Sequence, residues 1–126
     1  MKEPLWLTAE MILAIQEELL ARFGGREGLR DEGLLDSTLN RPRNCFLYKN
    51  PSLFELASEY ALGLVKNHPF LDGNKRIGLM AAYIFLGANG YELNAPEQEA
   101  VLNTLALVAG EIGAAEYAAW LKKSCA

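Results

Sequence analysis

A nine-residue segment with the sequence HPFLDGNKR, His68–Arg76, gathers the groups in this chain that could do chemistry. His68 is the only histidine of the protein, and an imidazole is the side chain best suited to proton transfer near neutral pH. Asp72 follows four residues later and can hold a hard cation such as Mg²⁺, which binds one or two carboxylates together with substrate phosphates. The segment therefore combines a candidate base with a candidate magnesium ligand.

The second half of the same segment suits an anion. Gly73 allows the backbone to turn tightly and to approach a ligand closely. A helix that begins here presents unpaired N–H groups and the positive end of its dipole. Lys75 and Arg76 add fixed positive charge, which costs a little stability at a helix start and is useful mainly where an anion binds. The set matches the needs of phosphoryl or nucleotidyl transfer, which are positioning, charge neutralisation and a base.

Each of these residues also has an ordinary structural interpretation. A histidine before a proline is more often a turn residue than a base, and Asp-Gly-Asn is common turn chemistry. Lys75 and Arg76 could form a solvated first turn of a helix. Spacing and charge alone therefore leave a phosphate site and a structural turn both open. Phe70 is expected in the core under either hypothesis.

The elements that position this segment are expected to be helices. Leu and Ala together occur 39 times, whereas Val, Ile and Thr together occur 11 times, a composition that favours helices over strands. Caps and breakers predict an all-α fold of about six helices. The first runs from Thr8 to Phe23, with Ile12, Ile15, Leu19 and Phe23 on its inner face. The others are Asp31–Asn40, a helix from the capping box Ser52–Glu55 to Asn67, one from Gly73–Arg76 to Asn89–Gly90, one from Pro96 to Gly110, and Ala114–Lys122. The helix that follows Gly73 is apolar nearly all round, which predicts that it is the central, buried one.

The stretch Arg43–Pro51 lacks helical periodicity and is predicted to be loop or extended chain, after a helix that ends before Pro42. Phe46 and Tyr48 stand at alternate positions, and free backbone groups here would suit the docking of an extended protein substrate. An ordinary connecting loop with two half-buried aromatic residues is equally consistent with the pattern.

Length and composition narrow the classes of function. The 126 residues, 51% of them hydrophobic, predict a single domain over residues 1–126 with a core that needs no disulfide or structural metal. The net charge of −4 argues against direct binding of nucleic acid. Cys45 and Cys125 are too few ligands for zinc, and two unpaired thiols are favoured over a disulfide. The longest apolar run, Leu79–Ala88, is too short to cross a bilayer and no signal peptide is evident, so we expect a soluble cytoplasmic protein without a membrane partner.

The segment His68–Arg76 resembles the signature of the Fic/Doc superfamily, specifically its Doc (death-on-curing) toxin branch, whose pattern is H-x-F-x-D-x-N-K-R. All six fixed positions of the pattern match. The resemblance extends over nearly the whole chain, through Arg22–Gly25, Gly28–Leu35 and Phe85–Gly90. It implies an all-α Fic/Doc-like fold, in agreement with the helices predicted above.

The resemblance also implies a role for each residue of the motif. His68 would be the general base for a hydroxyl of the target protein, and Asp72 the Mg²⁺ ligand. The contacts to the phosphates of ATP would be Lys66, Gly73, Asn74, Lys75 and Arg76. Among these, Lys66 lies outside the motif, at a position where a relative can carry another basic residue.

Two chemistries occur in the superfamily, and two residues discriminate between them. Fic-type AMP transferases resemble H-P-F-x-x-G-N-G-R-x-x-R, but Lys75 replaces the second glycine here and Leu79 replaces the final arginine. The lysine would crowd the α-phosphate pocket, and the missing arginine removes a phosphate clamp. Both departures match the Doc branch, whose members resemble kinases that transfer the γ-phosphate of ATP to a threonine hydroxyl of a translation elongation factor. An AMP transferase and an inactive scaffold are the alternatives, the latter opposed by intact His68 and Asp72.

A toxin needs restraint, and the inhibitory motif S/T-x-x-x-E-G/N of Fic-type proteins is absent from the sequence. The Doc resemblance therefore implies a separate antitoxin protein. Such a partner would place a segment, as an amphipathic helix, into an apolar groove between helices near His68.

Overall fold

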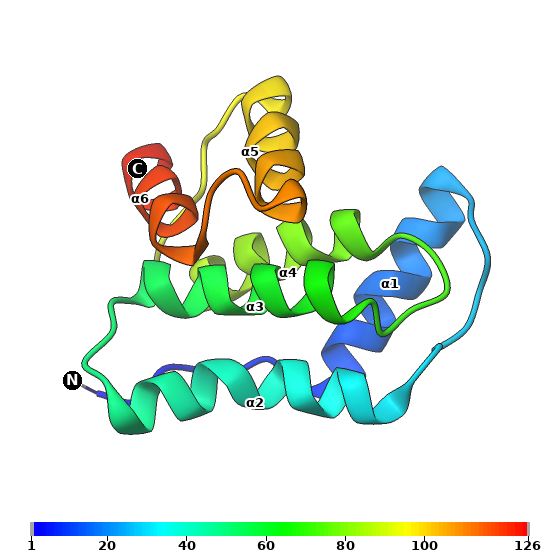
Figure 1. Cartoon of the computed structure of the whole chain (residues 1–126), viewed down its shortest axis with the longest axis horizontal. Helices are drawn as coiled ribbons and strands as arrows, with labels where there is room; N and C mark the ends of the chain where they lie inside the picture. The colour runs from blue at the N-terminus through cyan, green and yellow to red at the C-terminus, as the bar shows by residue number, and fades with distance from the viewer. Residues whose placement is uncertain (1, 126) are drawn as a thin grey trace.

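The computed structural model describes residues 2–125 and contains six α-helices in that range (Figure 1). They are α1 (Ala9–Phe23), α2 (Glu32–Tyr48), α3 (Leu53–Asn67), α4 (Asn74–Ala88), α5 (Glu97–Ala109) and α6 (Ala114–Ser124). Extended pairing within residues 2–125 is limited to two isolated β-bridges, Leu29–Phe70 and Leu93–Cys125. The prediction of an all-α fold with about six helices is confirmed.

The central helix is α3, so the prediction that α4 is central is wrong. Nine residues of α3 are buried, and the helix packs against α2, α4, α5 and α6 (Figure 1). On α4, Ile77, Ala81 and Phe85 are fully buried, but Met80 and Ile84 are partly exposed beside α1. Apolar composition alone did not distinguish α3, which has neighbours on most sides, from α4, whose second apolar face lines a surface groove.

Local capping signals place most helix ends correctly. The Thr8 hydroxyl accepts a hydrogen bond from the Met11 N–H at 3.2 Å, and Ser52 and Glu55 form the expected capping box. Gly110 ends α5 in the left-handed conformation, with φ 77°. The prediction that Phe23 lies on the inner face of α1 is wrong, because its side chain is 63% exposed at the end of the helix.

The second helix is longer than predicted. It continues as α2 through Pro42 to Tyr48, so the predicted stop at Asn40 is wrong. The predicted loop over Arg43–Pro51 is wrong for residues 43–48 and confirmed for residues 49–51, which lie between α2 and α3. A proline inside a helix removes one hydrogen bond and costs roughly 3 kcal/mol. An opposing contribution must therefore come from outside the helix.

Packing against α3 supplies that contribution. Leu35, Thr38 and Pro42 lie on one side of α2 and are all buried, and Arg41 forms an ion pair with Glu59 of α3 at 3.1 Å. Because the ring of Pro42 is itself part of the buried face, tertiary burial outweighs the local preference of proline to end a helix.

The longer helix removes the backbone argument for substrate docking at this place. Residues 43–48 are helical and their N–H groups bond within α2, so this stretch is not an extended segment that could pair with an extended peptide. Phe46 packs edge-on against Trp6, with ring centroids 5.6 Å apart. Tyr48 is 84% exposed, and docking of a substrate beside it stays a prediction that rests on this side chain alone.

Two further expectations concern the thiols and membranes. Cys45 and Cys125 are both free, and burial raises the pKa of each thiol, which disfavours a reactive thiolate. Within residues 2–125, every helix is too short or too polar to cross a bilayer.

Gly78 permits a close approach of α4 to α3. A Cβ atom at this position would lie 2.9 Å from Val65 Cγ1 and 3.2 Å from the carbonyl oxygen of Ala61. Both distances are shorter than an ordinary van der Waals contact. The Ala61 oxygen is a backbone atom of α3, so it cannot move aside as a flexible side chain could. Residues 68–73 of the motif segment join α3 to α4, so this contact brings together the two helices that the segment connects.

We predict opposite effects of two Gly→Ala substitutions in α4. Gly78→Ala should lower the free energy of unfolding by about 1–3 kcal/mol, because overpacking against α3 outweighs the better helix propensity of alanine. Gly87→Ala is the matched control, since a Cβ there meets nothing within 4 Å, and it should raise stability by up to about 1 kcal/mol. Urea denaturation followed by circular dichroism measures both. A stabilising Gly78→Ala would contradict the described α3–α4 contact.

Candidate active site

The motif segment forms the turn that joins α3 to α4. His68 follows the last residue of α3 in the left-handed conformation, with φ 49° and ψ 57°, and is the one non-glycine residue in the described part of the chain with positive φ. This conformation costs a side-chain-bearing residue about 1 kcal/mol or more, and such strain concentrates at functional sites. The His68 side chain is exposed. The imidazole is therefore accessible to a large substrate such as a protein.

The buried amide of Asn74 braces this turn. Its Oδ1 accepts a hydrogen bond from the Phe70 N–H at 3.1 Å, and its Nδ2 donates to the Phe70 carbonyl oxygen at 3.0 Å. The same Nδ2 lies 3.5 Å from Nδ1 of His68, a long contact that orients the ring weakly. Phe70 itself is 3% exposed, which confirms its predicted place in the core. One amide thus holds the anchor of the turn and reaches the candidate base.

Asp72 presents a carboxylate at the surface of the turn. Its Oδ1 accepts from the Gly73 N–H at 2.9 Å and its Oδ2 from the Arg26 N–H at 3.3 Å. Each oxygen keeps a lone pair for a cation. Across residues 2–125, no group of three or more His, Cys, Asp or Glu side chains is placed to hold a metal. Asp72 accordingly offers one carboxylate, which fits an ion such as Mg²⁺ that takes its other ligands from phosphates and water.

The first turn of α4 carries an unbalanced positive charge. Lys75 and Arg76 are exposed there, the turn contains no acidic residue, and Gly73 provides no side-chain cap. The first N–H groups of a helix have no partner within it. The Arg76 guanidinium carbon lies 5.0 Å from the ring centroid of Phe23 at the end of α1. These features together favour an anion at the start of α4.

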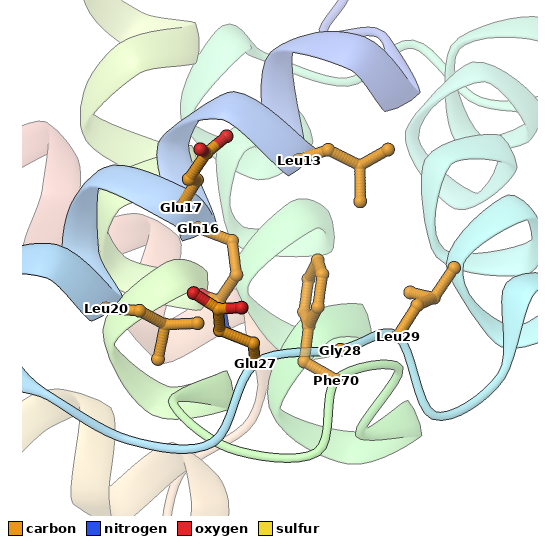
Figure 2. Close-up of a pocket in the computed structure, with 8 residues that line it drawn as sticks. All are labelled: Leu13, Gln16, Glu17, Leu20, Glu27, Gly28, Leu29 and Phe70. Atoms are coloured by element: carbon orange, nitrogen blue, oxygen red, sulfur yellow. The ribbon is translucent and has the colours of Figure 1, made fainter.

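A small pocket lies between α1, the segment that follows it, and Phe70 of the turn. Its volume is about 200 Å³, and Figure 2 shows the Phe70 ring rising from the motif segment into it. The lining residues are Leu13, Gln16, Glu17, Leu20, Glu27, Gly28, Leu29 and Phe70. Two of them, Glu17 and Glu27, are carboxylates, which repel phosphate groups. This pocket therefore suits the phosphates of a nucleotide less well than the cationic start of α4 does.

Comparison with known proteins agrees with this geometry. Residues 6–86, which include the whole turn, match the sequence model of the Fic/DOC family. The chain belongs to the Fic/DOC family. It is 29% identical over 118 residues to a protein named Protein kinase doc of Escherichia phage P1, covering 93% of each chain. It is 40% identical over 75 residues to a protein named Toxin Doc of Mycolicibacterium smegmatis, covering 58% of each chain. These relatives support the Doc branch that the motif predicts.

The Fic/DOC motif residues converge at this turn, but Lys66 points elsewhere. The Lys66 Nζ donates a hydrogen bond at 3.1 Å to the carbonyl oxygen of Val108, in the last turn of α5. A contact between Lys66 and a nucleotide would require this bond to break. The side chain of Asn74 is likewise engaged with Phe70, which leaves its backbone N–H as the group directed toward an anion at the helix start.

Sequence reasoning missed two residues whose side chains form short hydrogen bonds to the Fic/DOC motif from outside. The Arg30 side chain donates hydrogen bonds to the carbonyl oxygens of Asn67 and His68. The Gln16 Nε2 donates to the Asp72 carbonyl oxygen at 2.7 Å, and Gln16 is only 4% exposed. The signal for Gln16 is present in the sequence, because it is a polar residue on the apolar face of α1. Arg30 leaves no comparable signal, since it lies nearly forty residues from the segment that it contacts.

We predict that Asn74 and Lys75 differ in their effect on stability. Asn74→Ala should lower the free energy of unfolding by about 1–3 kcal/mol, because it leaves buried backbone groups of Phe70 unpaired. Lys75→Ala changes an exposed residue of the same helical turn, and should change stability by less than about 0.5 kcal/mol. Chemical denaturation measures both. Equal, small effects would show that the amide does not brace the turn.

Proposed function

We propose that this chain is a toxin of the Doc type, a protein kinase that transfers the γ-phosphate of ATP to a serine or threonine hydroxyl of another protein. One observation carries the proposal. A single turn brings together an exposed imidazole at His68, a carboxylate with free lone pairs at Asp72, and the cationic start of α4. The names Protein kinase doc and Toxin Doc of two relatives support the same activity.

In the proposed reaction, neutral His68 accepts the proton of the attacking hydroxyl at the ring nitrogen that faces the substrate. The hydroxyl oxygen forms a bond to the γ-phosphorus of ATP, the bond from that phosphorus to the bridging oxygen breaks, and ADP leaves with the electron pair. Lys75, Arg76 and the free N–H groups at the start of α4 bind the phosphates. Asp72 would hold Mg²⁺, which neutralises phosphate charge when bound.

The choice of the γ-phosphate over AMP transfer rests on two positions. Lys75 is exposed in the first turn of α4, where the Fic-type pattern has a glycine. Leu79 is half-buried against the core, where that pattern has an arginine, so no cation stands one turn further along the helix to hold a phosphate. We propose that the target is a translation elongation factor in the cytoplasm, as the Doc resemblance implies.

We further propose that a separate antitoxin protein restrains the toxin. An apolar groove of about 550 Å³ lies between α1 and α4. Its apolar lining includes Ile15, Leu19, Phe23, Met80 and Ile84. The groove reaches Phe23, whose ring lies against the Arg76 guanidinium. An amphipathic antitoxin helix seated here could direct an acidic side chain to the cations that otherwise bind ATP.

The decisive experiment uses ATP labelled on either its γ- or its α-phosphate, with purified protein and an elongation factor. We expect label on the target only from γ-labelled ATP. His68→Ala should lower the transfer rate by about 10²–10⁴-fold, the usual contribution of a general base. Incorporation from α-labelled ATP would instead establish AMP transfer.

A second substitution distinguishes the loss of the base from a change in the conformation of the turn. His68→Asn also removes the imidazole, and asparagine adopts the left-handed conformation more readily than alanine. We expect both variants to unfold at the same denaturant concentration as the wild-type protein. Wild-type transfer by either of them would exclude His68 as the base.

Growth of a bacterial host tests the toxin and antitoxin proposals together. Expression of the wild-type chain alone should arrest growth, and expression of His68→Ala should not. Co-expression of a small antitoxin encoded beside the gene should restore growth to the host carrying the wild-type chain. Met80→Glu places a charge in the apolar groove and should keep toxicity but lose this rescue. Normal growth with folded wild-type protein would contradict the toxin assignment.

A further inference from the structure

Arg30 forms a two-pronged contact with the end of α3. Its Nε donates to the His68 carbonyl oxygen at 2.7 Å, and its Nη2 donates to the Asn67 carbonyl oxygen at 2.8 Å. Carbonyl groups in the last turn of a helix lack partners within the helix and carry the negative end of its dipole. Short, charge-assisted bonds to these groups are stronger than neutral hydrogen bonds. Arg30 therefore closes the end of α3 at the residue that bears the candidate base.

The backbone of Arg30 is fixed against the same segment. Its N–H donates to the Pro69 carbonyl oxygen at 2.6 Å, and the neighbouring Leu29 forms a β-bridge with Phe70. The next residue, Asp31, caps α2 by accepting from the Leu34 N–H at 3.0 Å. The guanidinium thus starts from a backbone that is anchored both to the turn and to a helix. Such an anchor reduces the freedom of the long side chain.

His68 needs such support because its backbone conformation is unfavourable. A left-handed φ of 49° persists in a non-glycine residue only where surrounding contacts impose it. Asn74 contacts the His68 ring at the long distance of 3.5 Å, so the ring contact alone is weak. The strong hydrogen bond at His68 is the one that Arg30 Nε donates to its carbonyl oxygen, next to the bond that Arg30 Nη2 donates to the carbonyl oxygen of Asn67.

We infer that Arg30 is a positioning residue for His68 in the reaction proposed above, on which this inference rests. It holds two successive carbonyl groups, keeps His68 in the left-handed conformation, and so directs the imidazole toward the site of transfer. It touches neither substrate nor phosphate in this role. The planar fork matters as well as the charge, because a lysine ammonium cannot hold both carbonyl oxygens in one fixed geometry.

Arg30→Lys and Arg30→Met test the inference, with Arg41→Lys as the matched control. Arg41 is likewise an arginine that binds α3, through its ion pair with Glu59, but it has no hydrogen bond to the turn. Both Arg30 variants should lower kcat roughly 10- to 100-fold, because a displaced base loses its alignment with the hydroxyl. KM for ATP should stay within about twofold of wild type, since the phosphate-binding groups are unchanged. Arg41→Lys should retain wild-type kcat.

A second readout does not depend on activity. Because His68 is the only histidine, its ring signals in NMR spectra are identified without assignment of other residues. They should shift or split in Arg30→Met and stay unchanged in Arg41→Lys. Unchanged ring signals in Arg30→Met would overturn the inference, as would a wild-type kcat in both Arg30 variants. If wild-type protein transfers no phosphate but the ring signals move, the proposed function fails while the positioning role is supported.

Discussion

The side-chain amide of Asn74 is hydrogen-bonded to both backbone groups of Phe70, and this buried pair of bonds determines the path of the chain from α3 into α4. The amide belongs to the first turn of α4, whereas Phe70 belongs to the strained turn that follows α3. Because the bonds are buried, breaking them would leave polar groups unpaired away from water. The two bonds therefore hold the segment that carries His68 and Asp72 against the start of α4, where the cations lie.

The same turn is locally costly in two ways. His68 adopts a left-handed backbone, and Lys75 and Arg76 stand at the positive end of a helix dipole. In the proposed reaction, both features serve a phosphate that binds next to a base. The fold offsets these costs with buried contacts nearby, including the Phe70 side chain and the close packing at Gly78.

Support for the turn comes from parts of the chain that are distant in sequence. The segment between α1 and α2 contributes the Arg30 guanidinium and the β-bridge from Leu29 to Phe70, while α1 contributes the buried Gln16 amide. The motif residues therefore hold their positions through neighbours that a short signature does not contain. This dependence is why a pattern of nine residues identifies the family but does not describe how the site is held.

The sequence by itself determined the all-α class, the caps at Thr8 and Ser52, and the family, because these depend on local propensity and on a specific motif. Tertiary structure decided the rest. The buried face of α2 carried the helix through Pro42, since burial outweighed a local cost of roughly 3 kcal/mol. Tertiary packing also decided which helix is central, and it brought the Lys66 side chain to α5. Arg30 meets His68 only after the chain folds, because no local rule relates residues so far apart.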